Sequence, residues 1–407
     1  MRVLYLYQYF VARKGHGMTR AYEFARRLIC KGHEVTVVTL PGYLPEEYQQ
    51  FKKTTLIDIE GVPTIIIPVA YSNYMGFSRR ILAFVQFAIL ASWVCIRTPA
   101  DVIYASSGPL TIAIPAIIGK LFQRIPMVFE VRDLWPELPI AIGAIQNPLL
   151  KWLAKNLEWV AYHSSRHVVA LSPGMADGVE KRGVPKNRIT TIPNSCDIDL
   201  FDVPTEAGLP IRKKLGLDPA QPLVVYTGTF GLMNNVIYMV DIAHEMQKLK
   251  SDCRFLLIGS GAKFEETIDY AKQRNLLDKT VFIWKPLPKV EVPAVLSAAT
   301  VTSSLFLPVR EMWHNSANKF FDSLAAGRPI AINYGGWQAE LLKETGAGIQ
   351  IAADDPRQAA HQLADFLNDP DRLALAGAAA KELAHTRFHR DKMADKLEAV
   401  LKQVTGQ

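Results

Sequence analysis

Three charged side chains follow an apolar segment in the first half of the chain, and their types are those that act on phosphates and hydroxyl groups. Residues 127–131 read MVFEV, which is typical of a buried strand, and Arg132, Asp133 and Glu137 come soon after them. A guanidinium group can bind an anion such as a phosphate, and a carboxylate can orient a hydroxyl group. The alternative is an Arg–Asp pair that only holds a loop in place.

Two glycines lie in the loop between the first predicted strand and the first predicted helix. Apolar residues recur at helical spacing from Met18 onward, so this helix is predicted to begin near Gly17, with Gly15 in the loop before it. Free backbone N–H groups and the helix dipole can hold an anion there. The loop is long and Arg20 occupies the third glycine position, so it is not a dinucleotide fingerprint. A plain flexible loop is the alternative.

A second group of such residues lies in the second half of the chain. Residues 315–333 predict a helix followed by a buried strand, and Lys319 and Asp322 share one face of that helix. A surface ion pair, worth less than ~1 kcal/mol, is the alternative interpretation. Gly335 and Gly336 begin another helix at the carboxyl end of a strand, where doubly wound sheets bind ligands.

Short β-rich segments alternate with helical segments along the whole chain. The predicted strands cover residues 3–7, 34–39, 64–69, 101–106, 127–131, 167–172, 189–192, 223–228, 254–259, 280–284, 301–306 and 329–333. Continuous apolar strands separated by helices are typical of parallel sheets that are buried on both faces. The sequence therefore predicts an α/β protein with two doubly wound, Rossmann-like domains.

The alternation breaks at residues 192–210, where Pro, Asn, Gly and acidic residues indicate a linker. The predicted parts are a first domain, a linker, a second domain and a C-terminal helix, over residues 1–195, 196–210, 211–388 and 389–407, respectively. Asp197 and Asp199 form a D-x-D pair that could hold a cation, but without a third carboxylate nearby turn chemistry is favoured. No metal site is expected.

The composition of the chain shows an uneven distribution of charge and indicates a cellular compartment. The chain has 407 residues and a net charge of +7. Residues 1–200 hold 22 Lys and Arg against 15 Asp and Glu, whereas the remainder holds 24 of each. A basic half favours an anionic partner such as phosphate, nucleic acid or a membrane surface, although solubility alone explains many such biases. Four widely spaced cysteines and no leader before the first strand predict a reducing cytoplasm.

The segment 81–96 is apolar on nearly every face. As a helix of 16 residues it would rise ~24 Å, short of the ~30 Å needed to span a bilayer. Basic residues flank it and aromatic residues lie within it, namely Arg79, Arg80, Arg97, Phe84, Phe87 and Trp93. It could therefore lie on an anionic membrane surface, and a buried crossover helix is the alternative.

Several of these segments, in this order, resemble glycosyltransferase family 4. They are GHGMTR (15–20), YEFARRLICKGHEVTVVT (22–39), ALSPGM (170–175), IPNSCDIDLF (192–201), FLLIGSGA (255–262), NKFFDSLAAGRPI (318–330) and GGWQAEL (335–341). The resemblance covers nearly the whole chain. Residues 130–137 (EVRDLWPE) and the apolar segment resemble, more narrowly, bacterial members that extend lipid-linked saccharides, including N-acetylfucosamine transferases.

The resemblance implies a GT-B fold, in which two Rossmann-like domains face one another across a cleft. The first domain would bind the acceptor and the second the sugar nucleotide. In the family's E-x7-E motif the second Glu corresponds to Asp322, which would hold the nucleotide ribose, and the first falls on His314. Glu311 lies one helical turn earlier and could replace it.

Other family positions depart from the pattern. The usual Arg and Lys after the first strand of the second domain are absent, and Thr229 and Asn234 stand there instead. Lys319, Lys285 or Arg310 would then neutralise the diphosphate. The donor-binding residues implied in this way are Gly15, Gly17, Thr229, Lys285, Glu311, Asn318, Lys319, Asp322, Gly335 and Gly336.

The resemblance implies a retaining, metal-independent transferase without a cofactor. It would move a sugar, such as an N-acetylated amino sugar, from UDP to a polyprenyl-diphosphate-linked saccharide of a surface polysaccharide (O-antigen, capsule or exopolysaccharide). It would work on the cytoplasmic face of the cell membrane, with no nucleic-acid partner. A nucleotide-sugar epimerase of the same fold and a non-catalytic subunit of a membrane assembly are the alternatives.

Overall fold

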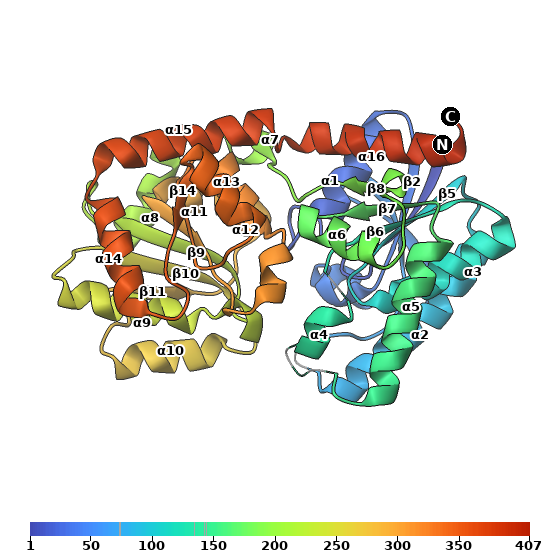
Figure 1. Ribbon diagram of the computed structural model, residues 1–407, viewed down its shortest axis with the longest axis horizontal. Coiled ribbons are helices and arrows are strands. Elements are labelled where there is room, and N and C mark those ends of the chain that lie inside the picture. The colour runs from blue at the N-terminus through green and yellow to red at the C-terminus, as the bar shows by residue number, and fades with distance from the viewer. Residues whose placement is uncertain (73–74, 134, 142, 144) are drawn as a thin grey trace. The chain divides into compact units, whose positions relative to one another are not determined.

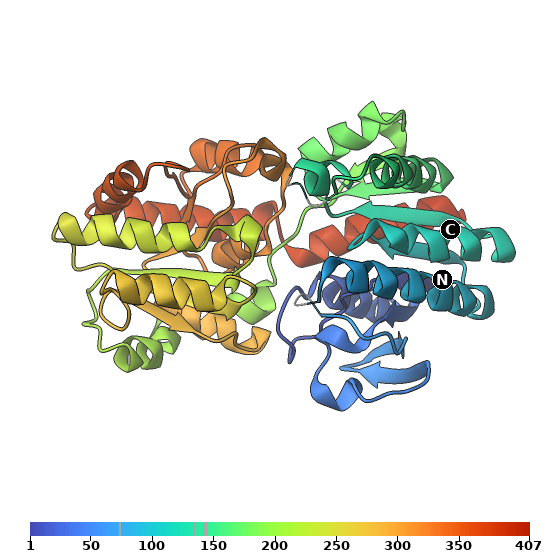
Figure 2. The same cartoon turned by 90° about the horizontal axis from the view of Figure 1, so that it is seen from below.

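The computed structural model describes residues 1–72, 75–133, 135–141, 143 and 145–407. The chain divides into two compact units (Figure 1). The first unit contains Met1–Pro193, His314–Ser316 and Asp391–Gln407, and the second contains Asn194–Trp313 and Ala317–Arg390. Each unit is an open sheet with helices on both faces, as Figure 2 shows.

The first unit is built on an eight-stranded sheet with the order β3-β4-β2-β1-β5-β6-β7-β8. Its strands are β1 (Arg2–Leu6), β2 (Glu34–Thr39), β3 (Thr55–Ile59), β4 (Val62–Ile66), β5 (Val102–Ser106), β6 (Met127–Val131), β7 (His167–Ala170) and β8 (Ile189–Thr191). Neighbouring strands are parallel except for β3 and β4, which form an antiparallel pair. The central strands are fully buried, which is why they read as continuous apolar runs.

Two groups of helices cover this sheet. One core contains side chains of α1 (Arg20–Cys30) and α16 (Arg390–Thr405). The opposite core contains side chains of α2 (Phe77–Arg97), α3 (Ala113–Gln123) and α5 (Pro148–Ser164). Two shorter helices, α4 (Glu137–Ala141) and α6 (Pro173–Lys181), complete the unit.

The second unit contains a six-stranded parallel sheet with the order β11-β10-β9-β12-β13-β14. Its strands are β9 (Leu223–Thr229), β10 (Arg254–Ser260), β11 (Val281–Trp284), β12 (Val301–Ser304), β13 (Ile330–Ile332) and β14 (Gly348–Gln350). Its helices are α7 (Ile198–Phe201), α8 (Leu209–Lys214), α9 (Ile237–Lys248), α10 (Phe264–Gln273), α11 (Val292–Ala298), α12 (Asn318–Ala325), α13 (Trp337–Thr345), α14 (Pro356–Leu367) and α15 (Pro370–Thr386). The prediction of two Rossmann-like α/β folds is confirmed.

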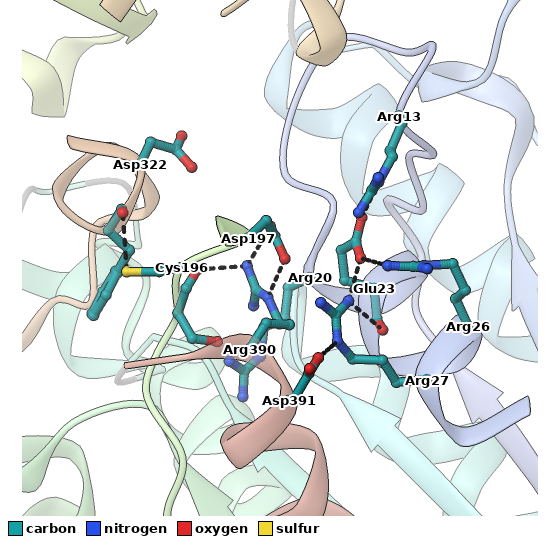
Figure 3. Close-up of polar contacts among 12 residues, drawn as sticks. Arg13, Arg20, Glu23, Arg26, Arg27, Cys196, Asp197, Asp322, Arg390 and Asp391 are labelled. Carbon is teal, nitrogen blue, oxygen red and sulfur yellow. Dashed lines mark hydrogen bonds and ion pairs between the residues drawn. The ribbon is translucent and has the colours of Figure 1, made fainter. Parts of the chain in front are cut away.

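The C-terminal helix returns to the first unit. Leu397 and Leu401 of α16 are fully buried in the core that also contains α1. Arg27 of α1 donates to Asp391 of α16 at 2.5 Å (Figure 3). The predicted linker 196–210 is not free chain, because α7, a 3-10 turn and the start of α8 pack within the second unit.

The predicted apolar helix is longer than the sequence segment suggested. Helix α2 has 21 residues and rises about 31 Å, so length does not exclude a membrane span. Among the described residues it is the one helix long and apolar enough to cross a bilayer. However, Phe84 and Phe87 are only 6% and 1% exposed, since they pack against the sheet. The prediction that these two rings face a membrane is wrong.

Candidate active site

A cationic site lies at the carboxyl end of β9 in the second unit. The Lys319 ammonium of α12 lies over the rings of Tyr226 and Phe306, 4.8 and 5.2 Å from their centroids. Its Nζ is 3.3 Å from the Tyr226 hydroxyl. When the Asn234 amide is oriented by its partners, its oxygen accepts from Lys319 Nζ at 3.1 Å and its nitrogen donates to the Thr229 carbonyl at 3.1 Å. The structure therefore brings together Thr229, Asn234 and Lys319.

The charge of this lysine is readily removed. Burial lowers the pKa of Lys319 to about 7, and Asp322 opposes that shift only in part. A Cβ atom on Gly228 would lie 3.0 Å from Lys319 Cε, so a residue without a side chain lets the lysine approach the β9 backbone. A lysine with a lowered pKa at the end of a strand can gain a proton and bind an anion.

Asp322 forms a buried ion pair with Lys289. Its Oδ2 accepts from Lys289 Nζ at 2.6 Å, and both side chains are buried, so the surface pair with Lys319, which was the alternative to a ligand site, does not form. Burial raises the pKa of the Asp322 carboxyl, and Lys289 lowers it in opposition. A second buried pair also acts on the charge of Asp322, and in it Asp197 accepts from Arg390 Nε and Nη2 at 2.8 and 2.9 Å (Figure 3). Asp197 therefore has a structural ion pair.

The predicted glycine pair lies against Trp313. A Cβ atom on Gly335 would be 3.1 Å from the Trp313 ring, and one on Gly336 would be 2.3 Å from the Trp313 carbonyl oxygen. Gly336 also has φ +84°, a conformation that favours glycine. The two glycines therefore allow the 3-10 turn Arg310–His314 to pack on the start of α13.

The remaining donor candidates are more dispersed. Arg310 and Glu311 are exposed on this same turn, and Lys285 is exposed after β11, two strands away from β9. Asn318 is the first residue of α12 and is half-buried. Of the three cations predicted for a diphosphate, Lys319 is therefore the one that the fold places beside Thr229 and Asn234.

A second cation lies at the carboxyl edge of the first unit's sheet. The Arg132 guanidinium lies 4.6 Å from the centroid of Tyr7, and its Nη2 is 3.5 Å from the sulfur of Met18. Its backbone N–H donates to Ser107 Oγ at 2.9 Å. Within the described part of the chain, the buried Nη1 of Arg132 has no hydrogen-bond partner. This orphan donor could serve an anionic ligand.

The two acidic candidates after β6 differ in their surroundings. Asp133 is half-buried, and burial raises the pKa of its carboxyl while Arg132 opposes the shift. Glu137 instead accepts from Arg182 Nη2 at 3.1 Å. Arg182 also pairs with the buried Glu158, whose pKa burial raises to about 7. Glu137 therefore has a structural role in the fold, as the ion-pair partner of Arg182, the residue after α6.

The early glycine loop comes before α1, but the helix begins three residues later than predicted, at Arg20. Gly17 has φ +138°, and a Cβ atom on Gly15 would lie 2.8 Å from Val11 Cγ1. Arg20 is fully buried and donates to Glu130 Oε1 from Nε and Nη2 at 3.0 and 2.8 Å. Its role is to tie α1 to β6. A glutamate within an apolar strand was the sequence signal for this pair.

Among the described residues, no group of three or more His, Cys, Asp or Glu side chains is placed to hold a metal ion. Cations, glycines and helix starts at the carboxyl edges of parallel strands are the features with which many α/β proteins bind nucleotides.

Comparison with known proteins narrows this class. Residues 17–195 match the model of the "Glycosyl transferase 4-like domain", and residues 209–383 match that of "Glycosyl transferases group 1". The chain is 20% identical to alpha-D-kanosaminyltransferase of Streptomyces kanamyceticus over 71% of its own length and 73% of that protein. It is 22% identical to WcaI of Escherichia coli K12, a candidate colanic acid biosynthesis glycosyl transferase, over 67% and 69% of the two chains.

The structure of Anabaena Alr3699/HepE in complex with UDP and glucose has the same fold. The TM-score is 0.72 at 16% identity, and the match covers 99% of this chain and 100% of that one. The chain belongs to glycosyltransferase family 4 and has the GT-B fold. It is therefore a glycosyltransferase that uses a nucleotide sugar.

Proposed function

We propose that the protein is a retaining, metal-independent transferase that moves a sugar from UDP to a lipid-diphosphate-linked saccharide. The observation that carries this proposal is the Lys319 site, where an ammonium lies over Tyr226 and beside Asn234 at the end of β9. A diphosphate bound there would have its charge neutralised by Lys319 and by free backbone N–H groups at helix starts. Asp322 would then hold the ribose, as the family motif implies.

The first unit would supply the remaining groups. Arg132 carries the buried, unpartnered Nη1 and would stabilise negative charge as the sugar–phosphate bond breaks. Asp133 would orient a hydroxyl group of the acceptor or the donor sugar. Because cationic side chains carry the leaving-group charge, no metal ion or other cofactor takes part.

Two further observations support the proposed acceptor and location. WcaI carries a name that refers to colanic acid biosynthesis, and helix α2 of this chain has an exposed apolar side. Both agree with a lipid-linked saccharide of the cell surface, with an N-acetylated amino sugar as one donor class. The protein would then be peripheral on the cytoplasmic face of the membrane.

Ligand-dependent thermal stability would test the donor. We expect UDP and one UDP-sugar to raise the melting temperature, because a ligand that binds only the folded state stabilises it by mass action. Transfer is then measured with a polyprenyl-diphosphate saccharide, and NMR of the product gives the anomeric configuration. Release of an epimer without acceptor would favour an epimerase. Failure to bind any nucleotide diphosphate would favour a non-catalytic subunit.

A further inference from the structure

Exposed apolar side chains are concentrated on one layer of the first unit. Of the 22 large hydrophobic residues exposed among those described, 14 lie on α2, α3 and α5. We call them the three-helix face: Ile81, Leu82, Val85, Ile89, Leu90, Trp93, Leu121, Phe122, Leu149, Leu150, Trp152, Leu153, Trp159 and Val160. A concentration of this kind is unusual for a surface that meets only water.

The three helices form a continuous layer on one side of the sheet. Helix α3 packs against both α2 and α5, and the inward side chains of all three belong to a single core. Phe87, Ala91 and Cys95 anchor the inner side of α2 there, with exposed fractions of 1%, 0% and 0%. Helix α2 therefore lies along the sheet and presents only its outer side.

The charges on this layer have one sign. Residues 77–97, 113–123 and 148–164 contain a single carboxylate, Glu158, which is 1% exposed and bound to Arg182. The same helices carry Arg79, Arg80, Arg97, Lys120, Lys151 and Lys155. The Arg97 guanidinium lies 4.3 Å from the centroid of the exposed Trp93. Tryptophan beside arginine is typical of a membrane interface.

A basic pocket adjoins this layer at the carboxyl ends of α3 and α5. Its volume is about 840 Å³, and no Asp or Glu lines it. Its cationic and titratable lining residues are Lys120, Arg124, His163, Arg166, His167 and Arg188. Arg188 Nε donates to the Arg166 carbonyl at 3.3 Å, which fixes its guanidinium in the wall of the pocket. The exposed Leu121 also lines the pocket, so the apolar and basic surfaces are continuous.

We infer that the three-helix face rests on an anionic phospholipid bilayer, with a lipid headgroup phosphate held in the basic pocket. This inference rests on the proposed membrane location and identifies the surface of the protein that would contact the membrane. The charges select this occupant, because a second copy docked on the same face would set like cations against one another. The tryptophans of α5 contact the interface, whereas Phe84 and Phe87 do not.

Vesicle co-sedimentation tests the inference. The wild-type protein should bind phosphatidylcholine vesicles that contain phosphatidylglycerol at least about tenfold more tightly than vesicles of phosphatidylcholine alone. Trp152→Ala with Trp159→Ala removes the apolar anchors, and Arg124→Glu with Arg166→Glu reverses charge at the pocket. Each pair should weaken binding at least about tenfold. UDP binding and melting temperature should stay at the wild-type values.

Matched controls lie on the second unit. Leu209→Ala with Leu375→Ala removes two side chains that are 52% and 72% exposed, and Lys213→Glu with Lys272→Glu reverses two exposed charges. Both controls should bind vesicles as the wild type does. Equal binding by all variants, or no preference for phosphatidylglycerol, would overturn the inference. Resistance to an alkaline carbonate wash would also overturn it, because α2 would then be inserted. Vesicle binding without sugar transfer would instead count against the proposed function alone.

Discussion

At the carboxyl edge of each sheet a cationic side chain lies over a tyrosine ring, but the cation is an arginine in one unit and a lysine in the other. In the first unit the Arg132 guanidinium lies 4.6 Å from the Tyr7 centroid, and in the second the Lys319 ammonium lies 4.8 Å from that of Tyr226. Each aromatic ring holds a cation at the end of a central strand. The two cations differ in how they respond to their surroundings.

Arginine stays charged, whereas the lysine can lose its proton. Burial lowers the pKa of Lys319 to about 7, so its charge near neutral pH depends on what is bound beside it. Arg132 keeps its charge and has an unused donor on Nη1, within the described residues. The difference suggests that the lysine site responds to the arrival of a diphosphate, while the arginine is ready before the reaction begins.

Loss of the lysine should have the largest effect. We expect Lys319→Met to lower kcat/KM for transfer by ~10²–10³-fold, because one preorganised donor to the leaving diphosphate is removed. Steady-state rates with the UDP-sugar measure this change. Lys272→Met, at an exposed lysine on α10, is the control and should have the wild-type rate. If kcat/KM of Lys319→Met were within about twofold of the wild-type value, Lys319 would not act on the diphosphate and the two cations could not be compared as catalytic groups.

Loss of Arg132 should lower the rate of transfer without changing the affinity for UDP, unlike loss of Lys319. We expect Arg132→Leu to lower kcat by roughly 10²-fold, because its charge acts as the bond to phosphate breaks. The affinity for UDP, measured by calorimetry, should stay the same, since Arg132 belongs to the other sheet. A parallel loss of UDP affinity would mean that both cations bind the free donor.

A third substitution tests how the second site is held in place. Lys289→Met leaves the buried Asp322 carboxylate without its ion-pair partner, so we expect the free energy of unfolding in urea to fall by about 2 kcal/mol. The double variant Lys289→Met with Asp322→Asn should recover most of that loss. No recovery would indicate that lysine packing, and not the ion pair, supports α12.

The smallest effect is expected at the other acidic candidate. Glu137→Gln should leave the transfer rate within about twofold and stability within about 1 kcal/mol, because its ion pair with Arg182 is partly exposed. Asp133→Asn, by contrast, should lower the rate at least about tenfold if the half-buried carboxyl orients a hydroxyl group. The reverse order would exchange the roles of the two carboxylates.

Much of the fold could be predicted because parallel strands buried on both faces read as apolar runs. Strands β3 and β14 were not predicted. β3 alternates half-buried and exposed residues in an antiparallel edge pair, and β14 has only three residues, one of them a glycine. The return of the C-terminal helix to the first unit was also missed, because an amphipathic pattern does not identify its partner.

Strand ends, glycines and a shared helix face were the sequence signals for the site. Gly335 and Gly336, which pack against Trp313, and Lys319, whose role at a diphosphate stays a prediction, were singled out by these signals. The Lys289–Asp322 pair was not, since its members lie 33 residues apart and meet only through the fold. The side of α2 that faces the core was equally hidden, because that helix is apolar on nearly every face.

The central claim, that Lys319 binds the donor diphosphate, is tested most directly by calorimetric titration of UDP from about pH 7 to about pH 9. A lysine that is neutral when free and charged when bound takes up one proton, so the association constant should fall by about tenfold per pH unit above its free pKa. Lys319→Arg, which stays charged, should show no such fall. A wild-type affinity that does not change over this range, or one that Lys319→Arg follows in parallel, would contradict the claim.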